Sequence, residues 1–123
     1  MNHIMRIPYV KGGRSEKGAD CYGIVRMVRA YLGRGDMPLL SEYAAGDYRQ
    51  ITREKEVANY SKCAPHAGAI AACYIGRICT HFGIVIEADG RIMVLDSTQE
   101  SGPRLTSIAS FESQFSKVEY YDN

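Results

Sequence analysis

The chain has 123 residues, of which 46% are hydrophobic and 24% are charged, and its formal net charge is +1. A chain of this length forms one domain around one core, so we predict a single domain over residues 1–123. The balanced charge argues against a nucleic acid or a charged membrane surface as partner, and no apolar run approaches the ~20 residues that span a bilayer.

The N-terminal residues favour a cytoplasmic protein, because residues 1–6 lack the apolar core of a signal peptide. In the cytoplasm the four cysteines are expected to be thiols rather than disulfides; they are Cys21, Cys63, Cys73 and Cys79. We expect Cys73 to be a plain buried residue, since it lies in an apolar run.

One helix is predicted in the N-terminal third, after an extended entry and a glycine turn at residues 7–13. Apolar residues recur there with the spacing of one helical face, at Ile24, Val25, Val28 and Leu32. Asp20 is a suitable N-cap and Gly33 a suitable C-terminal stop. The pattern therefore predicts a helix from Cys21 to about residue 32.

The rest of the chain reads as one more helix followed by strands. Residues 47–62 are polar with few apolar contacts and are predicted to be helical. After Pro65 the pattern becomes extended, with strands predicted at 69–75, 77–88, 91–98 and 117–121, a turn at 101–103 and a short helix within 106–115. Helices followed by an antiparallel sheet predict an α+β domain.

The start of the first helix is suited to a nucleophile. Cys21 is placed in the first turn, where unpaired backbone N–H groups and the helix dipole favour a thiolate. Such a thiol needs a base, and His81 in the strand at 77–88 is the best candidate.

The hairpin signal at Asp89-Gly90 supplies a third residue. A two-residue turn there pairs residue 88 with 91, residue 86 with 93, and Gly83 with Asp96. Side chains alternate along a strand, so His81 and Asp96 share a face as diagonal neighbours, and Gly83 has no side chain to obstruct them. We therefore predict that Asp96 accepts a hydrogen bond from His81 and sets its tautomer.

Together these residues indicate acyl transfer. Cys21 would attack an amide carbonyl, His81 would act as base and then acid, and Asp96 would orient His81. The backbone N–H of Cys21 would contribute to an oxyanion hole. This chemistry needs no cofactor and no metal.

Three segments carry a resemblance to a known family: PYVKGG at 8–13, GADCYGIV at 18–25 and HFGIVI at 81–86. As a set they resemble the NlpC/P60 family of cysteine peptidases. That family has a papain-like α+β fold, in which N-terminal helices carrying the cysteine pack on an antiparallel sheet carrying the histidine, and it acts on peptidoglycan stem peptides. The aromatic residue after the cysteine, followed by Gly-Ile-Val-Arg, is similar to phage and prophage tail members.

The resemblance implies roles for further residues. Tyr9 matches the family tyrosine near the oxyanion site, and Asp20 and Tyr22 are expected at the oxyanion and substrate sites. Two departures stand out: the family more often has Ser where this chain has Tyr22, and more often His where it has Asp96. Implied partners are a peptidoglycan peptide as substrate and phage tail proteins, with the virion tail as a further location.

Two other functions stay open. The first is a structural or assembly protein of a phage tail with a weak or unused site, which the departure at Tyr22 favours. The second is a zinc module, with four potential ligands in Cys63, His66, Cys79 and His81.

Overall fold

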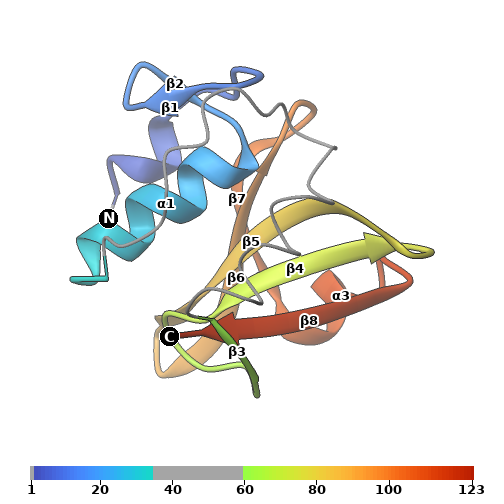
Figure 1. Cartoon of the computed structure of the whole chain (residues 1–123). Helices are drawn as coiled ribbons and strands as arrows, with labels where there is room; N and C mark the ends of the chain where they lie inside the picture. The colour runs from blue at the N-terminus through green and yellow to red at the C-terminus, as the bar shows by residue number, and fades with distance from the viewer. Residues whose placement is uncertain (1, 35–59) are drawn as a thin grey trace.

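The computed structural model describes residues 2–34 and 60–123 and shows an α+β architecture (Figure 1). Its elements in chain order are η1 (Ile4–Arg6), β1 (Arg14–Ser15), β2 (Gly18–Ala19), α1 (Cys21–Tyr31), β3 (Ser61–Cys63), β4 (Ile70–Ile75), β5 (Ile78–Ala88), β6 (Arg91–Thr98), β7 (Gly102–Ser107), α3 (Ile108–Glu112) and β8 (Lys117–Asp122). Most of the helix predicted at 47–62 lies outside the described residues, and its last two residues belong to strand β3 instead.

Helix α1 confirms the predicted helix and both of its end signals. The Asp20 carboxylate accepts a hydrogen bond from the Gly23 N–H at 2.9 Å, which caps the first turn. The helix ends at Tyr31, and Gly33 follows with a positive φ of 80° that a side chain would disfavour.

A six-stranded sheet forms most of the rest, in the order β3-β8-β4-β5-β6-β7, with every neighbouring pair antiparallel. The predicted hairpin is confirmed. Asp89 and Gly90 both have positive φ, 52° and 78°, and Ala88 pairs with Arg91 across the turn. Positive φ at both turn residues matches the right-handed twist of the flanking strands.

The short helix expected within 106–115 is confirmed as α3, but the expected turn at 101–103 needs correction. The turn ends at Ser101, and residues 102–103 begin strand β7. Pro103 suggested a turn, but β7 pairs only with β6 in the described sheet, so a residue without an N–H is tolerated there.

The sheet buries apolar side chains on both faces. Helix α1 covers one face, where its Ile24, Val25 and Val28 join residues of the sheet such as Ile70, Ala72, Phe82, Ile84 and Leu95. Helix α3 covers the other face, where Phe111 packs with Ala71, Cys73, Val85 and Val94. Figure 1 shows the two helices on opposite sides of the strands. In the part of the chain that the structure describes, no helix is long and apolar enough to cross a membrane.

Candidate active site

The N-terminus of α1 is held against the preceding loop by three glycines. An added Cβ at Gly13 would lie 2.4 Å from the Gly18 carbonyl oxygen, and one at Gly18 would lie 2.3 Å from Val10 Cγ2. A Cβ at Gly23, inside the helix, would lie 2.5 Å from the Gly13 oxygen. The close approach of these backbones fixes where α1 begins, and therefore where Cys21 lies.

Asp20 is fully buried, and its carboxylate is occupied by neighbours in this loop. Besides the Gly23 N–H, it accepts from the Gly12 N–H at 3.2 Å and from Arg14 Nη1 at 2.6 Å. The structure therefore places Asp20 as the anchor of the helix start, beneath the residue that would react.

Cys21 follows as the first residue of α1, is fully buried, and lies within hydrogen-bonding reach of His81. The two residues come from different sides of the sheet. Cys21 belongs to the α1 side, whereas the His81 ring stacks on Phe115, which follows α3, with centroids 5.8 Å apart.

The way in which β5 and β6 separate explains how Cys21 and His81 meet. The pairs Ile86–Met93 and Ala88–Arg91 confirm the predicted register, but the ladder ends at Ile84–Leu95, one pair before the expected Gly83–Asp96 pair. Beyond that point β5 pairs only with β4, and β6 only with β7. The N-terminus of α1, with Cys21, approaches His81 where β5 and β6 no longer pair.

The predicted contact between His81 and Asp96 is present. His81 Nε2 lies 2.8 Å from Asp96 Oδ2. The expected role of Gly83 in leaving room for this contact is not what the structure shows: a Cβ there would crowd Val94 Cγ1 at 2.7 Å and Phe111 Cζ at 3.1 Å, but would meet Asp96 Cβ at an ordinary 3.5 Å. With Nε2 bound to the carboxylate, Nδ1 is the ring nitrogen that remains to exchange a proton with Cys21.

The charges of the site favour an imidazolium at His81. Burial disfavours its protonation, but the charge of a Cys21 thiolate and the hydrogen bond to Asp96 outweigh burial and raise the pKa of His81 to about 9. Burial likewise opposes the charge of Asp96, yet hydrogen bonds from His81 and Arg104 hold the pKa of this carboxyl below its usual value. At neutral pH the site therefore holds His81 protonated and Asp96 ionised.

Sequence reasoning missed Arg104, which completes the surroundings of Asp96. Arg104 Nε donates to Asp96 Oδ1 at 2.9 Å and Nη2 to Oδ2 at 3.2 Å, while Nη2 also donates to Gln114 at 2.8 Å. The residue was overlooked because its segment was expected to be irregular. A strand at 102–107 would have placed Arg104 opposite Asp96.

Tyr9 lies near the reacting groups, as the resemblance implies. It forms a parallel bridge with Ala19, two residues before Cys21. Burial and the charges of Cys21 and Asp20 raise the pKa of Tyr9 to about 12. Its hydroxyl therefore stays protonated at neutral pH and remains a hydrogen-bond donor.

Tyr22, which the resemblance assigns to the substrate side, is only 1% exposed, and its ring packs edge-on against Phe82 with centroids 5.6 Å apart. The Arg14 guanidinium carbon lies over the Tyr22 ring, 5.1 Å from its centroid. These contacts make Tyr22 part of the core between α1 and the sheet.

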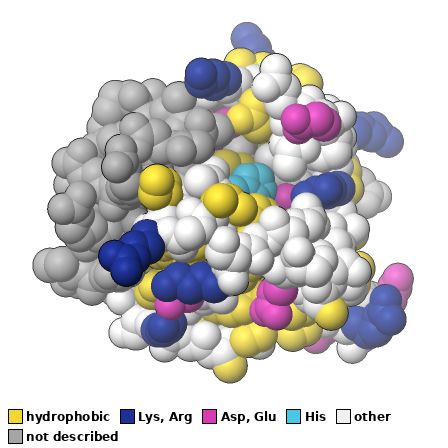
Figure 2. All heavy atoms as spheres, turned by 90° about the vertical axis from the view of Figure 1, so that its right-hand side faces the viewer, with side chains coloured by type: hydrophobic (Ala, Val, Ile, Leu, Met, Phe, Trp, Pro, Cys, Tyr) yellow, Lys and Arg dark blue, Asp and Glu magenta, His cyan; other side chains and the backbone are white. Residues whose placement is uncertain are grey.

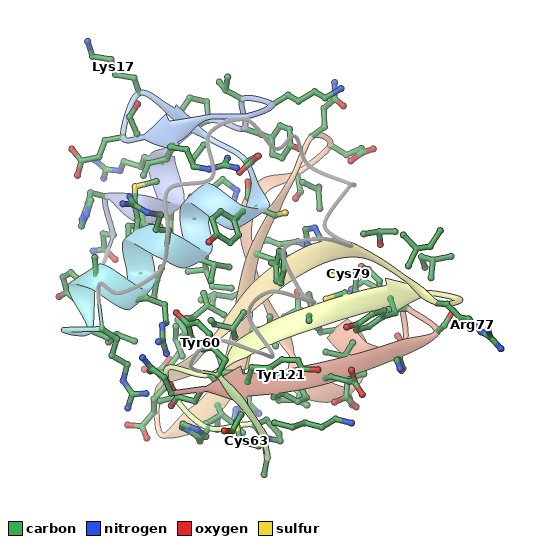
Figure 3. All side chains as sticks on the ribbon, viewed as in Figure 1. Lys17, Tyr60, Cys63, Arg77, Cys79 and Tyr121 are labelled. Carbon is green, nitrogen blue, oxygen red and sulfur yellow. The ribbon has the colours of Figure 1, made fainter. Side chains whose placement is uncertain are left out.

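The four residues considered as zinc ligands are not brought together. Cys63 lies on β3 and Cys79 on β5, well apart in the sheet (Figure 3). Within residues 2–34 and 60–123, no three His, Cys, Asp or Glu side chains are arranged to hold a metal ion.

The His81 side chain is 13% exposed and that of Arg104 34%, so the site reaches the surface beside Asp96. One face of the molecule shows a histidine at the surface next to acidic and basic side chains (Figure 2). Chemically, the arrangement supplies a nucleophile, a proton carrier and an orienting carboxylate. No protein-family model matches the chain, and no curated protein matches it significantly.

Proposed function

We propose that the protein is a cysteine peptidase of the NlpC/P60 type that hydrolyses amide bonds in peptidoglycan stem peptides. The observation that carries the proposal is the placement of His81 between two partners. Its Nε2 is bound to Asp96 at 2.8 Å, and its ring lies within reach of Cys21 at the start of a helix. A thiol, an imidazole and a carboxylate in this order form the triad that cysteine nucleophiles use.

The proposed reaction has two steps. The Cys21 thiolate attacks the amide carbonyl carbon, and the His81 imidazolium gives its proton to the leaving amine as the C–N bond breaks, which leaves a thioester. A water molecule then attacks the thioester, with His81 taking its proton, and the C–S bond breaks to release the acid and the Cys21 thiolate, which restores the starting thiolate and imidazolium. First-turn N–H groups at Cys21 and the Tyr9 hydroxyl are the donors we assign to the oxyanion.

The substrate class and the papain-like form of the fold rest on the resemblance, and the structural roles of the matching residues support it. Gly13, Gly18 and Gly23 of the matching segments permit the close backbone approaches at the helix start, and Gly83 of HFGIVI permits close packing against Val94 and Phe111. A cysteine helix packed on an antiparallel sheet that carries the histidine agrees with the family's arrangement.

Digestion of purified peptidoglycan, followed by mass analysis of the soluble fragments, tests the proposal. We expect cleavage within stem peptides by the wild-type protein and none by Cys21→Ala or His81→Ala. Intact stem peptides after prolonged digestion with folded wild-type protein would contradict it.

The burial of Cys21 favours a second candidate, a phage tail assembly or structural protein in which the site is weak or unused. Cys21 is 0% exposed, so a substrate reaches its sulfur only after a local rearrangement. Labelling of Cys21 by an electrophile in a single turnover separates the two functions. An unused site would react no faster than free cysteine, whereas a working nucleophile would react faster.

A further inference from the structure

We propose that Arg104 is a positioning residue of this site, which holds the Asp96 carboxylate in the one orientation that keeps His81 directed at Cys21. The expected effect of Arg104 on hydrolysis rests on the proposed function. The expected effect of Arg104 on His81 follows from the contacts alone.

The position of Arg104 is set by the pairing of β6 and β7. Asp96 and Arg104 are direct partners across this ladder. The guanidinium binds both carboxylate oxygens, with Nε on Oδ1 and Nη2 on Oδ2. Its planar fork matches a carboxylate in this way, so the carboxylate is prevented from rotating. Gln114 in turn fixes the guanidinium through Nη2.

The fixed carboxylate matters because Asp96 Oδ2 is also the acceptor for His81 Nε2. If the carboxylate turned, the imidazole would lose its anchor, and Nδ1 would no longer be held toward Cys21. Arg104 thus acts on the nucleophile through two intervening side chains, without touching the reacting atoms.

Arg104 also compensates the negative charge of the buried Asp96 carboxylate. Asp96 is 0% exposed, and a buried carboxylate is costly unless it is paired. Removing the guanidinium leaves the Asp96 carboxylate free to turn away from His81 Nε2, and the imidazolium then loses the hydrogen bond that raises the pKa of His81.

The proton affinity of His81 reports this effect, because few other charged groups face it in the described chain. Cys21 of α1 and Asp96 of β6 act on it directly. Cys73 of β4 pairs with His81, but burial holds the pKa of Cys73 well above its usual value, so it stays neutral. On the α3 side the His81 ring lies against the apolar rings of Phe111 and Phe115.

The experiment compares Arg104→Met, Arg104→Lys and the control Arg91→Met with the wild type. Arg91 is an exposed arginine at the other end of β6. The first measurement is the NMR titration of the His81 ring, assigned by its loss in His81→Gln; the chain has only three histidines. The second is kcat and KM for peptidoglycan fragments, and thermal unfolding verifies the fold of each variant.

We expect Arg104→Met to move the His81 titration downward by about 0.5 pH units or more, because the imidazolium loses its hydrogen bond to Asp96 when the carboxylate turns. The same change should lower kcat about 10-fold with KM unchanged. Arg104→Lys keeps the charge but loses the fork, so the His81 titration also falls and kcat stays reduced. The control changes neither. If Arg104→Met does not fold, Arg104→Gln replaces it, with the same downward shift expected.

A titration of His81 that is unchanged or moves upward in folded Arg104→Met or Arg104→Gln would overturn the proposal, even if stability fell. A wild-type protein that leaves peptidoglycan intact would count against the proposed function only. The titration shift would then still decide the role of Arg104.

Discussion

At the residue scale, each buried charge that shapes the site is paired. Asp20 is bound by Arg14 and backbone N–H groups at the start of α1, and Asp96 is bound by His81 and Arg104. Burying a charge without a partner is expensive, so the partners are part of what the sequence must encode. The first set holds the helix start at Cys21, and the second set holds the His81 ring.

Cys21 should be alkylated faster than the other three cysteines at neutral pH. Burial raises the pKa of Cys63, places that of Cys73 well above its usual value and raises that of Cys79 to about 12, so these remain thiols. Iodoacetamide labelling followed by peptide mass spectrometry measures the four rates, with Cys21→Ser as the control that removes the fast site. Equal rates at all four positions would contradict the assignment.

Stability should fall as pH rises into the alkaline range because of His81. Its pKa is about 9 in the folded protein and about 6.5 when unfolded. The folded state therefore binds more protons than the unfolded state between these values. The stabilisation is complete below about pH 6.5 and is lost as pH rises through about 9.

The contribution of His81 protonation to folding stability is measured by comparing the urea unfolding midpoints of wild type and His81→Gln from about pH 6.5 to about pH 9. The difference between the two proteins should shrink toward alkaline pH. Parallel pH profiles would show that His81 does not have the raised pKa.

Asp96→Asn should reduce turnover far more than binding. The amide keeps the shape of the carboxylate but not its charge, so it stabilises the imidazolium poorly and permits the wrong tautomer of His81. A loss in kcat of up to ~10⁴-fold is expected for such a change. Steady-state kinetics measure it, with Asp89→Asn in the exposed hairpin turn as the control. Wild-type kcat in Asp96→Asn would remove Asp96 from the site.

At the element scale, the start of α1 and the separation of β5 from β6 build the site. Glycines permit the close backbone approaches that fix the helix start. The early end of the β5–β6 ladder brings that helix start to a histidine on the other side of the sheet. Neither feature alone would place Cys21 beside His81.

Gly23→Ala should destabilise the protein, although alanine favours a helix by ~1 kcal/mol over glycine. The new Cβ would lie 2.5 Å from the Gly13 oxygen, a backbone atom that cannot move aside cheaply. We expect a net loss of about 1–2 kcal/mol from the crowding.

Chemical denaturation measures this loss. Ala30→Gly, at an exposed position of the same helix, serves as the control that reports helix propensity alone. Stabilisation by Gly23→Ala would show that the backbones are farther apart than described.

At the scale of the whole molecule, Arg29 joins α1 to two distant parts of the chain. It is fully buried, and its Nη1 donates to the Gly68 carbonyl at 2.9 Å and to Asp122 at 2.7 Å. Nη2 donates to Asn123 at 2.9 Å, and the guanidinium lies 5.6 Å from the Tyr60 ring centroid. The contacts connect the far end of the cysteine helix to the loop before β4 and to the end of β8.

Arg29→Met should therefore lower the free energy of unfolding by about 3 kcal/mol, because it leaves a carbonyl and part of a carboxylate without a donor. Asp122 keeps Arg34 as a partner, so the loss should not be larger. Urea denaturation measures the change against the exposed Arg91→Met. A change within the error of that control would show that the cluster does not hold these elements together.

The sequence by itself determined the features that depend on near neighbours. The 21–31 helix with Asp20 and Gly33 at its ends, the strands β4, β5 and β6, and the Asp89-Gly90 turn follow from capping, alternation and turn chemistry. The turn sets a register over several residues, which is why the contact between His81 and Asp96 was predictable from the chain alone. The helix predicted at 47–62 lies largely outside the described residues.

Only the tertiary structure decided the features that depend on distant segments. Strand β7 was missed because Pro103 and Gly102 suggest a turn, and its extended form depends on pairing with β6. Arg104 was missed with it, although it binds the Asp96 carboxylate. That Tyr22 packs against Phe82 could also not be read from the sequence. Packing against another element overrides local propensity wherever the partner lies far along the chain, and here such packing places Cys21 beside His81.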